Sequence, residues 1–281
     1  MIDLKEVQIL SAKTRLEIFK TFNKLGYGHL GGSFSIVELL SVLYTNQMKI
    51  DPKNPNWDER DRLVLSKGHA GPALYSTLAN LGYFPIEELR TLNEGGTNLP
   101  SHPDRLKTIG VDATTGSLGQ GISVAGGMAT GFKLDKKPNY VYAIVGDGEL
   151  NEGQCWEAFQ YIAHNKLNNC IVIIDDNKKQ LDGPTEDIMN PFDIQLKMEA
   201  FGFETLKVKG DDILGIDAAI SYLKTVPDKA VCLVLDSIKG QGIPYFEELA
   251  DNHSVKFNTD ELKNEVNKAM ASLTEIIEGG N

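Results

Sequence analysis

Residues 140–153 read YVYAIVGDGELNEG and carry the strongest structural signal in the chain. Residues 140–145 are almost entirely apolar, which is typical of a strand that is buried on both faces of a parallel sheet. Gly146, Asp147 and Gly148 follow directly, and the two glycines allow a tight turn and a close approach of the backbone to a ligand. An amphipathic helix is predicted after the turn. The stretch therefore predicts a strand that places the carboxylate of Asp147 at its own carboxyl end.

Three other apolar runs share the character of residues 140–145, and they lie at 62–65, 170–174 and 231–235. Apolar residues at helical spacing predict helices at 4–25, from about 35 to 43, and at 71–81, 117–133, 153–165 and 212–224. This alternation indicates an α/β fold, a mostly parallel sheet flanked by helices and joined by right-handed crossovers. The sequence has no internal repeat or low-complexity linker, so we expect one domain over residues 1–281. The last seven residues, EIIEGGN, are expected to be a fraying helix end.

The composition narrows the class of protein. Of the 281 residues, 41% are hydrophobic, and the formal net charge is −11. Nucleic acids and anionic membranes would repel such a chain, so we expect neither as a partner. The sequence contains neither an apolar run near the roughly 18–20 residues that span a bilayer nor a signal-peptide pattern, so we expect a cytoplasmic protein. Cys155, Cys170 and Cys232 are odd in number and far apart, which favours buried thiols over disulfides or a zinc site.

Asp147 has a candidate partner at the end of the next predicted strand. After Gly148 come 28 residues, 149–176, that cover one helix and one strand, and then Asn177. Neighbouring parallel strands end at the same edge of the sheet, where ligands gather in α/β proteins. Carboxylate and amide oxygens at that edge could share one Mg²⁺, which proteins usually hold with few oxygens of their own plus phosphates and water. For the Gly-Asp-Gly turn taken alone, a plain turn is the alternative interpretation.

Gly146-Asp147-Gly148 and then, after 28 residues, Asn177 resemble the signature of thiamine-diphosphate enzymes. Further stretches narrow the resemblance to the transketolases and occur in that family's order: Gly28-His29-Leu30-Gly31-Gly32-Ser33, Ser66-Lys67-Gly68-His69-Ala70, Ser101-His102-Pro103, Thr115-Gly116-Ser117-Leu118-Gly119-Gln120-Gly121, Asp175-Asp176-Asn177 with Leu181-Asp182-Gly183, and Asn252-His253-Ser254. The resemblance covers nearly the whole chain. It implies the thiamine-diphosphate-binding fold, in its diphosphate-binding domain, with thiamine diphosphate and Mg²⁺ or Ca²⁺ as cofactors.

The resemblance also implies roles for individual residues. The implied metal ligands are the side chains of Asp147 and Asn177 and the backbone carbonyl of Lys179. The implied cofactor contacts are Asp147 and Asn177 together with His69, Gly116, Ser117, Leu118, Gly146, Gly148, Glu149 and His253. The implied catalytic residues are His29, His69, His102, His253 and Glu152. The histidines are expected to line a channel over the thiazolium ring, and Glu152 to join a carboxylate network that runs towards a neighbouring subunit.

Four of the five histidines lie in these motifs, flanked by Gly, Ser or Pro rather than set in an apolar pattern. Imidazoles donate hydrogen bonds to sugar hydroxyls and exchange protons near neutral pH, which suits a site for sugar chemistry. His164, the fifth, is expected at the surface. Glu152 has a simpler explanation as well, because an acidic side chain at a helix start is favoured by the helix dipole. Close packing of helix against sheet is the alternative explanation for Gly119 and Gly121.

The family resemblance points to a second chain. Transketolases activate the aminopyrimidine of the cofactor with a glutamate from another α/β domain, and this sequence stops at residue 281, soon after Asn252-His253-Ser254. We therefore expect the N-terminal, diphosphate-binding subunit of a split transketolase. A second subunit would supply the pyrimidine-binding domain, with two copies of each chain in the assembly. The expected reaction transfers a two-carbon ketol unit from a ketose to an aldose, with sugars or sugar phosphates as substrates.

Other functions stay open at this point. The chain could be a subunit like 1-deoxyxylulose-5-phosphate synthase or like the E1 α subunit of a 2-oxo-acid dehydrogenase, or a non-catalytic thiamine-diphosphate-binding regulatory subunit. The segment GHLGGSFS at 28–35 differs from the GHPGAP-like run of long transketolases and is closer to the short subunits. A plain nucleotide-binding protein is disfavoured because the sequence has neither GxGxxG nor GxxxxGK[ST].

Overall fold

The computed structural model describes residues 2–279 and is built around a five-stranded sheet. The order is β2-β3-β4-β6-β5, and these strands span Arg62–Leu65, Val141–Gly146, Cys170–Asp176, Ala230–Asp236 and Phe203–Lys209 in that order. Every neighbouring pair is parallel, so the five carboxyl ends lie at one edge of the sheet. The four predicted strands and the α/β class are confirmed.

The sequence analysis missed β5, which lies at one edge of the sheet. Its sequence, Phe-Glu-Thr-Leu-Lys-Val-Lys, mixes apolar and polar residues, and only Phe203 and Thr205 are buried, so the strand has no continuous apolar run. Such alternation is expected of a strand with one partly solvated face. A search for strands buried on both faces therefore passes over it.

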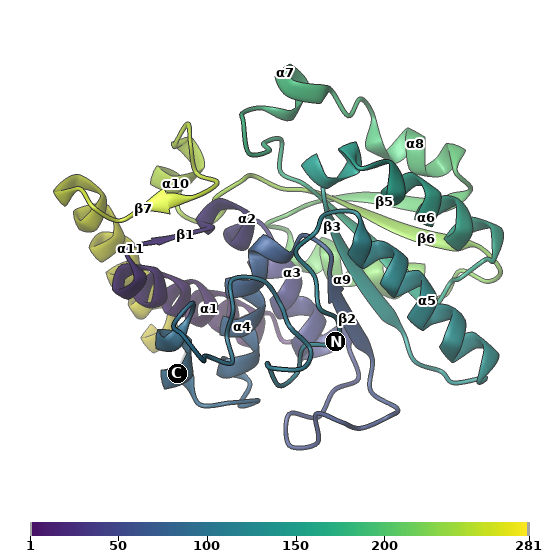
Figure 1. Ribbon diagram of the computed structural model, residues 1–281, viewed down its shortest axis with the longest axis horizontal. Helices are drawn as coiled ribbons and strands as arrows, with labels where there is room; N and C mark the ends of the chain where they lie inside the picture. Colours follow the sequence, from purple (N-terminus) through teal and green to yellow (C-terminus); the bar gives the residue numbers. More distant parts are fainter. Residues whose placement is uncertain (1, 280–281) are drawn as a thin grey trace.

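Helices cover both faces of the sheet (Figure 1). One layer contains α1 (Leu4–Leu25), α3 (Val37–Val42), α4 (Gly71–Asn80), α9 (Ile213–Leu223) and α11 (Asp260–Gly279), and the other contains α5 (Gln120–Leu134), α6 (Gly153–His164) and α8 (Ile194–Ala200). Successive strand residues point to opposite faces. On β3, Tyr142 and Ile144 enter the first apolar core, and Ala143 and Val145 enter the second.

Several short elements link these layers. They are β1 (Tyr27–Gly28) paired antiparallel with β7 (Val255–Lys256), the helices α2 (Leu30–Phe34), α7 (Thr185–Met189) and α10 (Pro244–Glu248), the 3₁₀ turns Gly68–Ala70, Ile86–Thr91 and Gly148–Asn151, and the π-helical turn Leu43–Gln47. The β1–β7 pair joins the two ends of the chain, because it holds the segment after α1 against the segment before α11.

The predicted helices are found with shifted boundaries. α1 matches its prediction: Asp3 caps its start, and Gly26, with φ of 86°, ends it. The helix expected from about residue 35 is instead α3 followed by a π-helical turn, with α2 as a separate helix before it. Residues 275–279 are the end of the 20-residue helix α11, whereas Gly280 and Asn281 lie outside the described residues.

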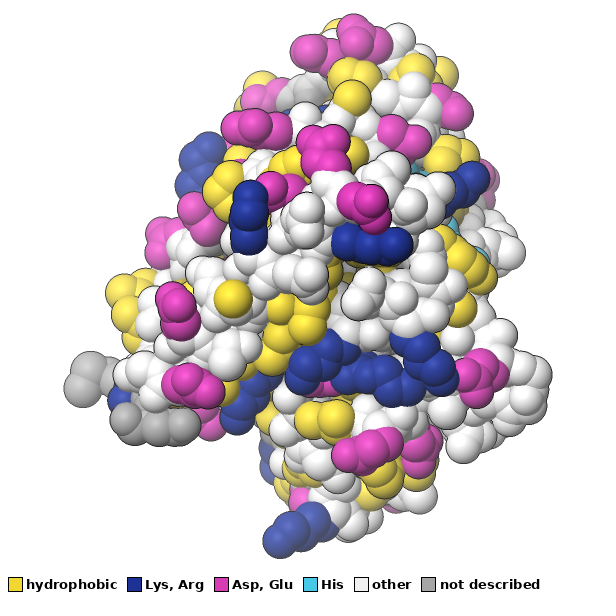
Figure 2. Space-filling view, turned by 90° about the vertical axis from the view of Figure 1, so that its left-hand side faces the viewer, with side chains coloured by type: hydrophobic (Ala, Val, Ile, Leu, Met, Phe, Trp, Pro, Cys, Tyr) yellow, Lys and Arg dark blue, Asp and Glu magenta, His cyan; other side chains and the backbone are white. Residues whose placement is uncertain are grey.

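The surface charges and the three cysteines can be compared with what the composition predicted. Figure 2 shows acidic side chains scattered among basic and apolar ones on the face that lies to the left in Figure 1. Within residues 2–279, none of the helices is long and apolar enough to cross a membrane. Cys155, Cys170 and Cys232 are unpaired and buried, as predicted.

Candidate active site

A cavity of about 260 Å³ lies where β2, β3 and β4 end. It is lined by His29, Lys67, His69, His102, Gly116, Leu118, Gly146, Asp147, Gly148, Glu149, Asn177, Lys179, Gln180, Leu181, Lys239 and His253. Segments from residue 29 to residue 253 therefore meet in one place. The carboxyl ends of parallel strands form this edge, which is where ligands bind in open α/β sheets.

Asp147, Asn177 and Lys179 form one corner of the cavity, which we call the metal corner after the role predicted for it. The register of β3 and β4 pairs Gly146 with Asp175, so the two strand ends lie side by side. One oxygen of the Asp147 carboxylate accepts the Gly148 N–H at 2.8 Å, and the other accepts the Lys178 N–H at 2.7 Å. The sheet register thus brings together residues thirty positions apart.

The Asp147 carboxylate is only 3% exposed. Burial, with the nearby negative charges of Asp175 and Asp176, raises its pKa to about 7. Two backbone hydrogen bonds oppose this shift without cancelling it. A hard divalent cation would favour the ionised carboxylate, so the donor set of this corner suits such an ion.

Asn177 and Lys179 present oxygens beside Asp147. The amide nitrogen of Asn177 donates to Asp175 Oδ2 at 2.7 Å, and its Oδ1 accepts the Lys179 N–H at 3.2 Å. The carbonyl of Lys179, the third predicted metal ligand, accepts a hydrogen bond from Lys239 Nζ at 3.2 Å. A carboxylate, an amide oxygen and a carbonyl therefore lie around the same corner, which is the oxygen-rich set that Mg²⁺ and Ca²⁺ take.

The four motif histidines line the same cavity, and we call them the histidine cluster: His29, His69, His102 and His253. The ring centroid of His29 lies 5.9 Å from that of His69, 6.3 Å from that of His102 and 5.3 Å from that of His253. The rings of His69 and His253 are 5.1 Å apart. The clustering predicted from their sequence context is thus found in the structure.

The histidine cluster is neutral at physiological pH. Burial is the largest cause that lowers the pKa of all four rings, and it brings His253 to about 4. The positive charges of Lys67 and Lys239 add to the shift for His69 and His253. A neutral imidazole both donates and accepts hydrogen bonds, whereas a protonated one can only donate. The neutral form therefore suits a ligand rich in hydroxyl groups.

Glycines allow two of these rings to take their positions. A Cβ on Gly32 would lie 2.8 Å from Nε2 of His69. Gly116 has φ of 145°, and a Cβ there would lie 3.1 Å from Cγ of His102. Any side chain at either position would press on a ring of the cluster.

Glu149 holds three loops around the cavity together by hydrogen bonds. Its carboxylate accepts hydrogen bonds from the Ser66 hydroxyl at 2.5 Å, the Gly119 N–H at 2.8 Å and the Gly146 N–H at 3.0 Å. Burial raises the pKa of Glu149, whereas these donors act in the opposite direction. Glu149 lines the cavity, but its charge is directed to the protein's own loops, so we interpret it as a structural anchor rather than a direct ligand contact.

Comparison with known proteins decides the family. The sequence pattern described as "Transketolase, thiamine diphosphate binding domain" matches residues 7–271. The chain belongs to the transketolase family. It is 48% identical over 262 residues to the 6-deoxy-6-sulfo-D-fructose transketolase subunit SqwG of Clostridium sp., a match that covers 93% of this chain and 94% of that subunit. The predictions of a transketolase N-terminal subunit and of the thiamine-diphosphate-binding fold are confirmed.

Longer transketolases match over part of their length only. Transketolase 1 of Saccharomyces cerevisiae is 38% identical over 271 residues, which cover 91% of this chain but 38% of that protein. The crystal structure of the transketolase of Campylobacter jejuni superposes with a TM-score of 0.87 at 28% identity, covering 99% of this chain and 47% of that one. The chain thus spans less than half the length of these transketolases.

Two residues that the transketolase resemblance singled out lie outside the cavity lining, Ser117 and Glu152. Both are exposed. The Glu152 backbone caps the start of α6, and its side chain packs beside Gly119, where a Cβ would lie 2.9 Å from Cβ of Glu152. The carboxylate network expected for Glu152 involves another subunit and stays a prediction.

Four cavity residues were not assigned to the site from the sequence: Lys67, Gln180, Leu181 and Lys239. Lys67 and Lys239 are 1% and 2% exposed, although lysine normally lies in solvent. Lys67 follows the end of β2, and Lys239 comes three residues after the end of β6. Their position after strand ends places both lysines at the same edge of the sheet as Asp147.

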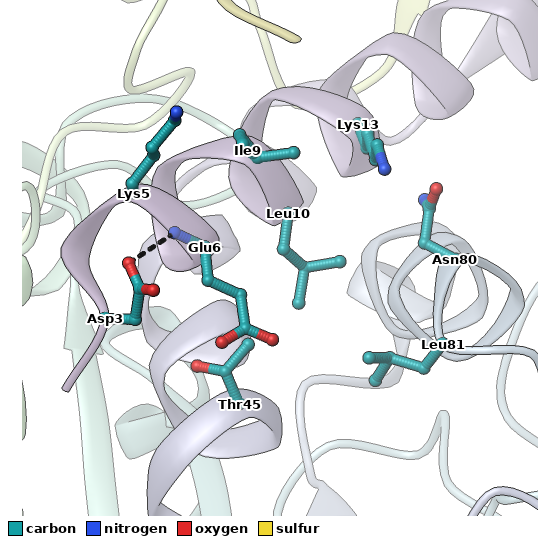
Figure 3. A pocket seen from close by; sticks show the side chains of 9 residues that line it. All are labelled: Asp3, Lys5, Glu6, Ile9, Leu10, Lys13, Thr45, Asn80 and Leu81. Carbon is teal, nitrogen blue, oxygen red and sulfur yellow. Dashed lines mark hydrogen bonds between the residues drawn. The ribbon is translucent and has the colours of Figure 1, made fainter. Parts of the chain in front are cut away.

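A second hollow, of about 430 Å³, lies between the start of α1 and the end of α4 (Figure 3). Asp3, Glu6, Lys5 and Lys13 line it with mixed charges, and Figure 3 shows the two lysines pointing apart. Asp3 is already used as a helix cap through its hydrogen bond to the Glu6 N–H at 3.1 Å. This hollow is larger but collects no converging polar groups, so we place the site at the strand ends.

Proposed function

We propose that this chain is the diphosphate-binding subunit of a two-chain transketolase that transfers a two-carbon ketol unit from a ketose to an aldose. The metal corner and the histidine cluster in one cavity carry the proposal. The lengths of the relatives support the two-chain form, because the chain covers 94% of the subunit SqwG but 38% of Transketolase 1.

The donor set of the metal corner fits a divalent cation bound together with a diphosphate. Asp147, Asn177 and the Lys179 carbonyl would hold Mg²⁺ or Ca²⁺, and the ammonium groups of Lys67 and Lys239 add positive charge beside it. Gly116 and Leu118 also line the cavity and would contact the cofactor. Thiamine diphosphate supplies the nucleophilic carbon and the electron sink for cleavage next to a carbonyl, and the protein supplies position and proton control.

The histidine cluster would bind the sugar hydroxyls and move protons. Lys239 Nζ lies 3.0 Å from Nδ1 of His253. An ammonium can only donate, so Nδ1 accepts and the proton of neutral His253 is on Nε2. His253 is therefore a hydrogen-bond donor at Nε2 towards a ligand. His102, the more exposed ring, would contact the part of the sugar nearer the opening.

A second subunit would complete the site with the pyrimidine-binding domain, in an assembly with two copies of each chain. The substrate is suggested by the 48% identical relative, whose name specifies 6-deoxy-6-sulfo-D-fructose, so a sulfonated ketose is the first donor to test. Ordinary sugar phosphates are the second. A cytoplasmic location is part of the proposal, since three unpaired thiols suit a reducing compartment.

Native mass spectrometry of the complex purified from its own cells tests this function. We expect two copies of this chain with two copies of a different chain, together with thiamine diphosphate and a divalent metal. The isolated complex should convert a ketose and an aldose into a new pair of sugars. Carbon dioxide release from a 2-oxo acid would support a 2-oxo-acid dehydrogenase or a synthase instead, and a homodimer that binds no cofactor when supplied with it would overturn the proposal.

A further inference from the structure

We propose that Asp175 is a positioning residue: it orients the amide of Asn177 so that the amide oxygen faces the metal, and it thereby sets the affinity of the site for the metal. This inference rests on the proposed function, because it assumes that the metal corner binds a divalent cation. It assigns a role to a residue that does not line the cavity.

Asp175 is fully buried and accepts hydrogen bonds from four separate segments. Its Oδ2 accepts from Ser35 Oγ at 2.8 Å, Lys67 Nζ at 2.6 Å and Asn177 Nδ2 at 2.7 Å, and its Oδ1 accepts from Ser237 Oγ. These donors come from the end of α2, the end of β2, the loop after β4 and the end of β6. The carboxylate is held in place because its donors come from different elements.

A carboxylate with these partners determines which way the neighbouring amide points. An ionised Asp175 can only accept, so the atom of Asn177 that faces it must be the amide nitrogen. Oδ1 of Asn177 then lies on the other side, where it accepts the Lys179 N–H at 3.2 Å and keeps a second lone pair. If the amide turned over, its N–H₂ group would face the cation and repel it.

The charge of Asp175 is balanced within the protein. Lys67 forms an ion pair with it, and the two side chains are 1% and 0% exposed. The hydroxyls of Ser35 and Ser237 satisfy the remaining acceptor positions. Asp175 does not line the cavity and its oxygens already accept four hydrogen bonds, so its effect on the metal passes through Asn177.

The test compares three variants of the full chain, in complex with its partner subunit if the chain requires it. Asp175→Asn replaces one acceptor oxygen with a donating N–H₂ group and removes the charge, so the acceptor that faces Asn177 is no longer fixed. Asn177→Ala removes the ligand itself. The exchange Asp175→Asn with Asn177→Asp keeps the net charge and places a carboxylate at position 177, where both oxygens are equivalent and no orientation is needed.

The readout is Mn²⁺ affinity, measured by electron paramagnetic resonance in the presence of inorganic diphosphate. The metal-independent control is diphosphate binding in EDTA. We expect Asp175→Asn to weaken Mn²⁺ binding by about 10- to 100-fold, the range for residues that orient ligands. Diphosphate binding in EDTA should stay within about twofold in every variant, because a merely structural loss would lower both affinities. The exchange variant should regain most of the Mn²⁺ affinity.

Each outcome decides the proposal. Unchanged Mn²⁺ affinity in a folded Asp175→Asn variant, or an exchange variant as weak as Asn177→Ala, would overturn the role of Asp175 and leave the proposed function intact. A wild-type protein that binds thiamine diphosphate without Mn²⁺ or Mg²⁺ would overturn both. If Asp175→Asn does not fold, the exchange variant is decisive on its own, because it retains the buried charge that balances Lys67.

Discussion

The metal corner and the histidine cluster share one cavity but are assembled in different ways. The metal corner comes from the ends of two neighbouring strands, β3 and β4, whose register is fixed by a ladder of backbone hydrogen bonds. The histidine cluster comes from four segments that share no element, at residues 29, 69, 102 and 253. The first is a local consequence of the sheet, and the second depends on how distant loops pack.

This difference predicts that the metal corner and the histidine cluster affect different steps, cofactor binding and turnover. Substitutions in the metal corner should remove cofactor binding and spare the histidines, since the ladder holds the corner in place without them. Substitutions of His29 and His102, the two histidines of the cluster that the resemblance does not place against the cofactor, should lower turnover and spare cofactor binding. An enzyme in which both sets of changes had the same effect would show that the cavity acts as one unit.

The largest effect is expected from Asp147→Ala. It removes the only carboxylate of the metal corner, so metal-dependent binding of thiamine diphosphate should weaken by about 100-fold or more, since even changes behind a metal ligand cost 10- to 100-fold. Titration with thiamine diphosphate, followed by quenching of the protein's intrinsic fluorescence with and without EDTA, measures this affinity. Asp187→Ala, an exposed carboxylate on α7, is the control and should bind normally. Equal affinity in the two variants would remove Asp147 from the metal site.

His102→Ala should show the opposite pattern. We expect kcat of the assembled enzyme to fall by about 100-fold, the lower end for a group in proton transfer, with an unchanged Kd for thiamine diphosphate. Steady-state rates and cofactor titration on the same preparation separate the two quantities. His164→Ala changes the one histidine outside the cluster, at the exposed end of α6, and should leave both unchanged. A rate for His102→Ala equal to that of His164→Ala would place His102 outside the chemistry.

Gly116→Ala tests whether packing holds the histidine cluster. The new Cβ would lie 3.1 Å from the His102 ring at a φ of 145°, so we expect a loss of about 1–3 kcal/mol in the free energy of unfolding and a slower enzyme. Gly127→Ala on α5 is the matched control. Its Cβ would meet nothing within 4 Å, and it should gain up to about 1 kcal/mol. Urea denaturation compares the two; a neutral Gly116→Ala would mean that the loop has room to move.

The smallest effect concerns the pH dependence of stability. Burial lowers the pKa of His253 to about 4, whereas the unfolded value is 6.5. Between these values the unfolded chain binds a proton that the folded chain does not, so stability falls as the pH is lowered from 6.5 towards 4. Because the ring is partly exposed, we expect the contribution to be on the order of 1 kcal/mol.

Urea denaturation of the wild type and of His253→Gln at pH 7 and pH 4.5 isolates this contribution from that of Asp147, whose raised pKa acts with the opposite sign. The advantage of the wild type over the variant should shrink at the lower pH. A difference that stays constant would show that His253 titrates normally in the folded protein.

The sequence predicted the metal corner better than its surroundings. Asp147 and Asn177 follow apolar strands, and a parallel sheet brings such strand ends together whatever the rest of the chain does. The edge strand β5 lacks an apolar run and was missed. Lys67 and Lys239 were missed for another reason. Their burial is created by other segments of the chain, by Asp175 beside Lys67 and by the carbonyls of Lys179 and Gln180 beside Lys239, and the type of a residue does not reveal such neighbours.

The histidine cluster lies between these cases. Its members were found because four histidines stand among small residues and match a family, but nothing in their spacing predicted ring centroids 5.1–6.3 Å apart. That arrangement needs the glycines at 32 and 116, which the structure shows in contact range of the rings. Ser117 and Glu152 carried similar sequence signals and nevertheless lie outside the cavity lining.

The rate at which the three buried thiols react with an alkylating reagent reports how often the folded protein opens. Cys170 and Cys232 lie on the adjacent strands β4 and β6, and Cys155 lies on α6. Burial raises the pKa of each thiol, so an alkylating reagent can reach a thiolate only while the surrounding layer is open. The labelling rate of each cysteine therefore measures how often the layer around it opens. Adding cofactor or partner should slow the labelling of Cys170 and Cys232 on the strands more than that of Cys155 on α6. The three native cysteines suffice for this measurement.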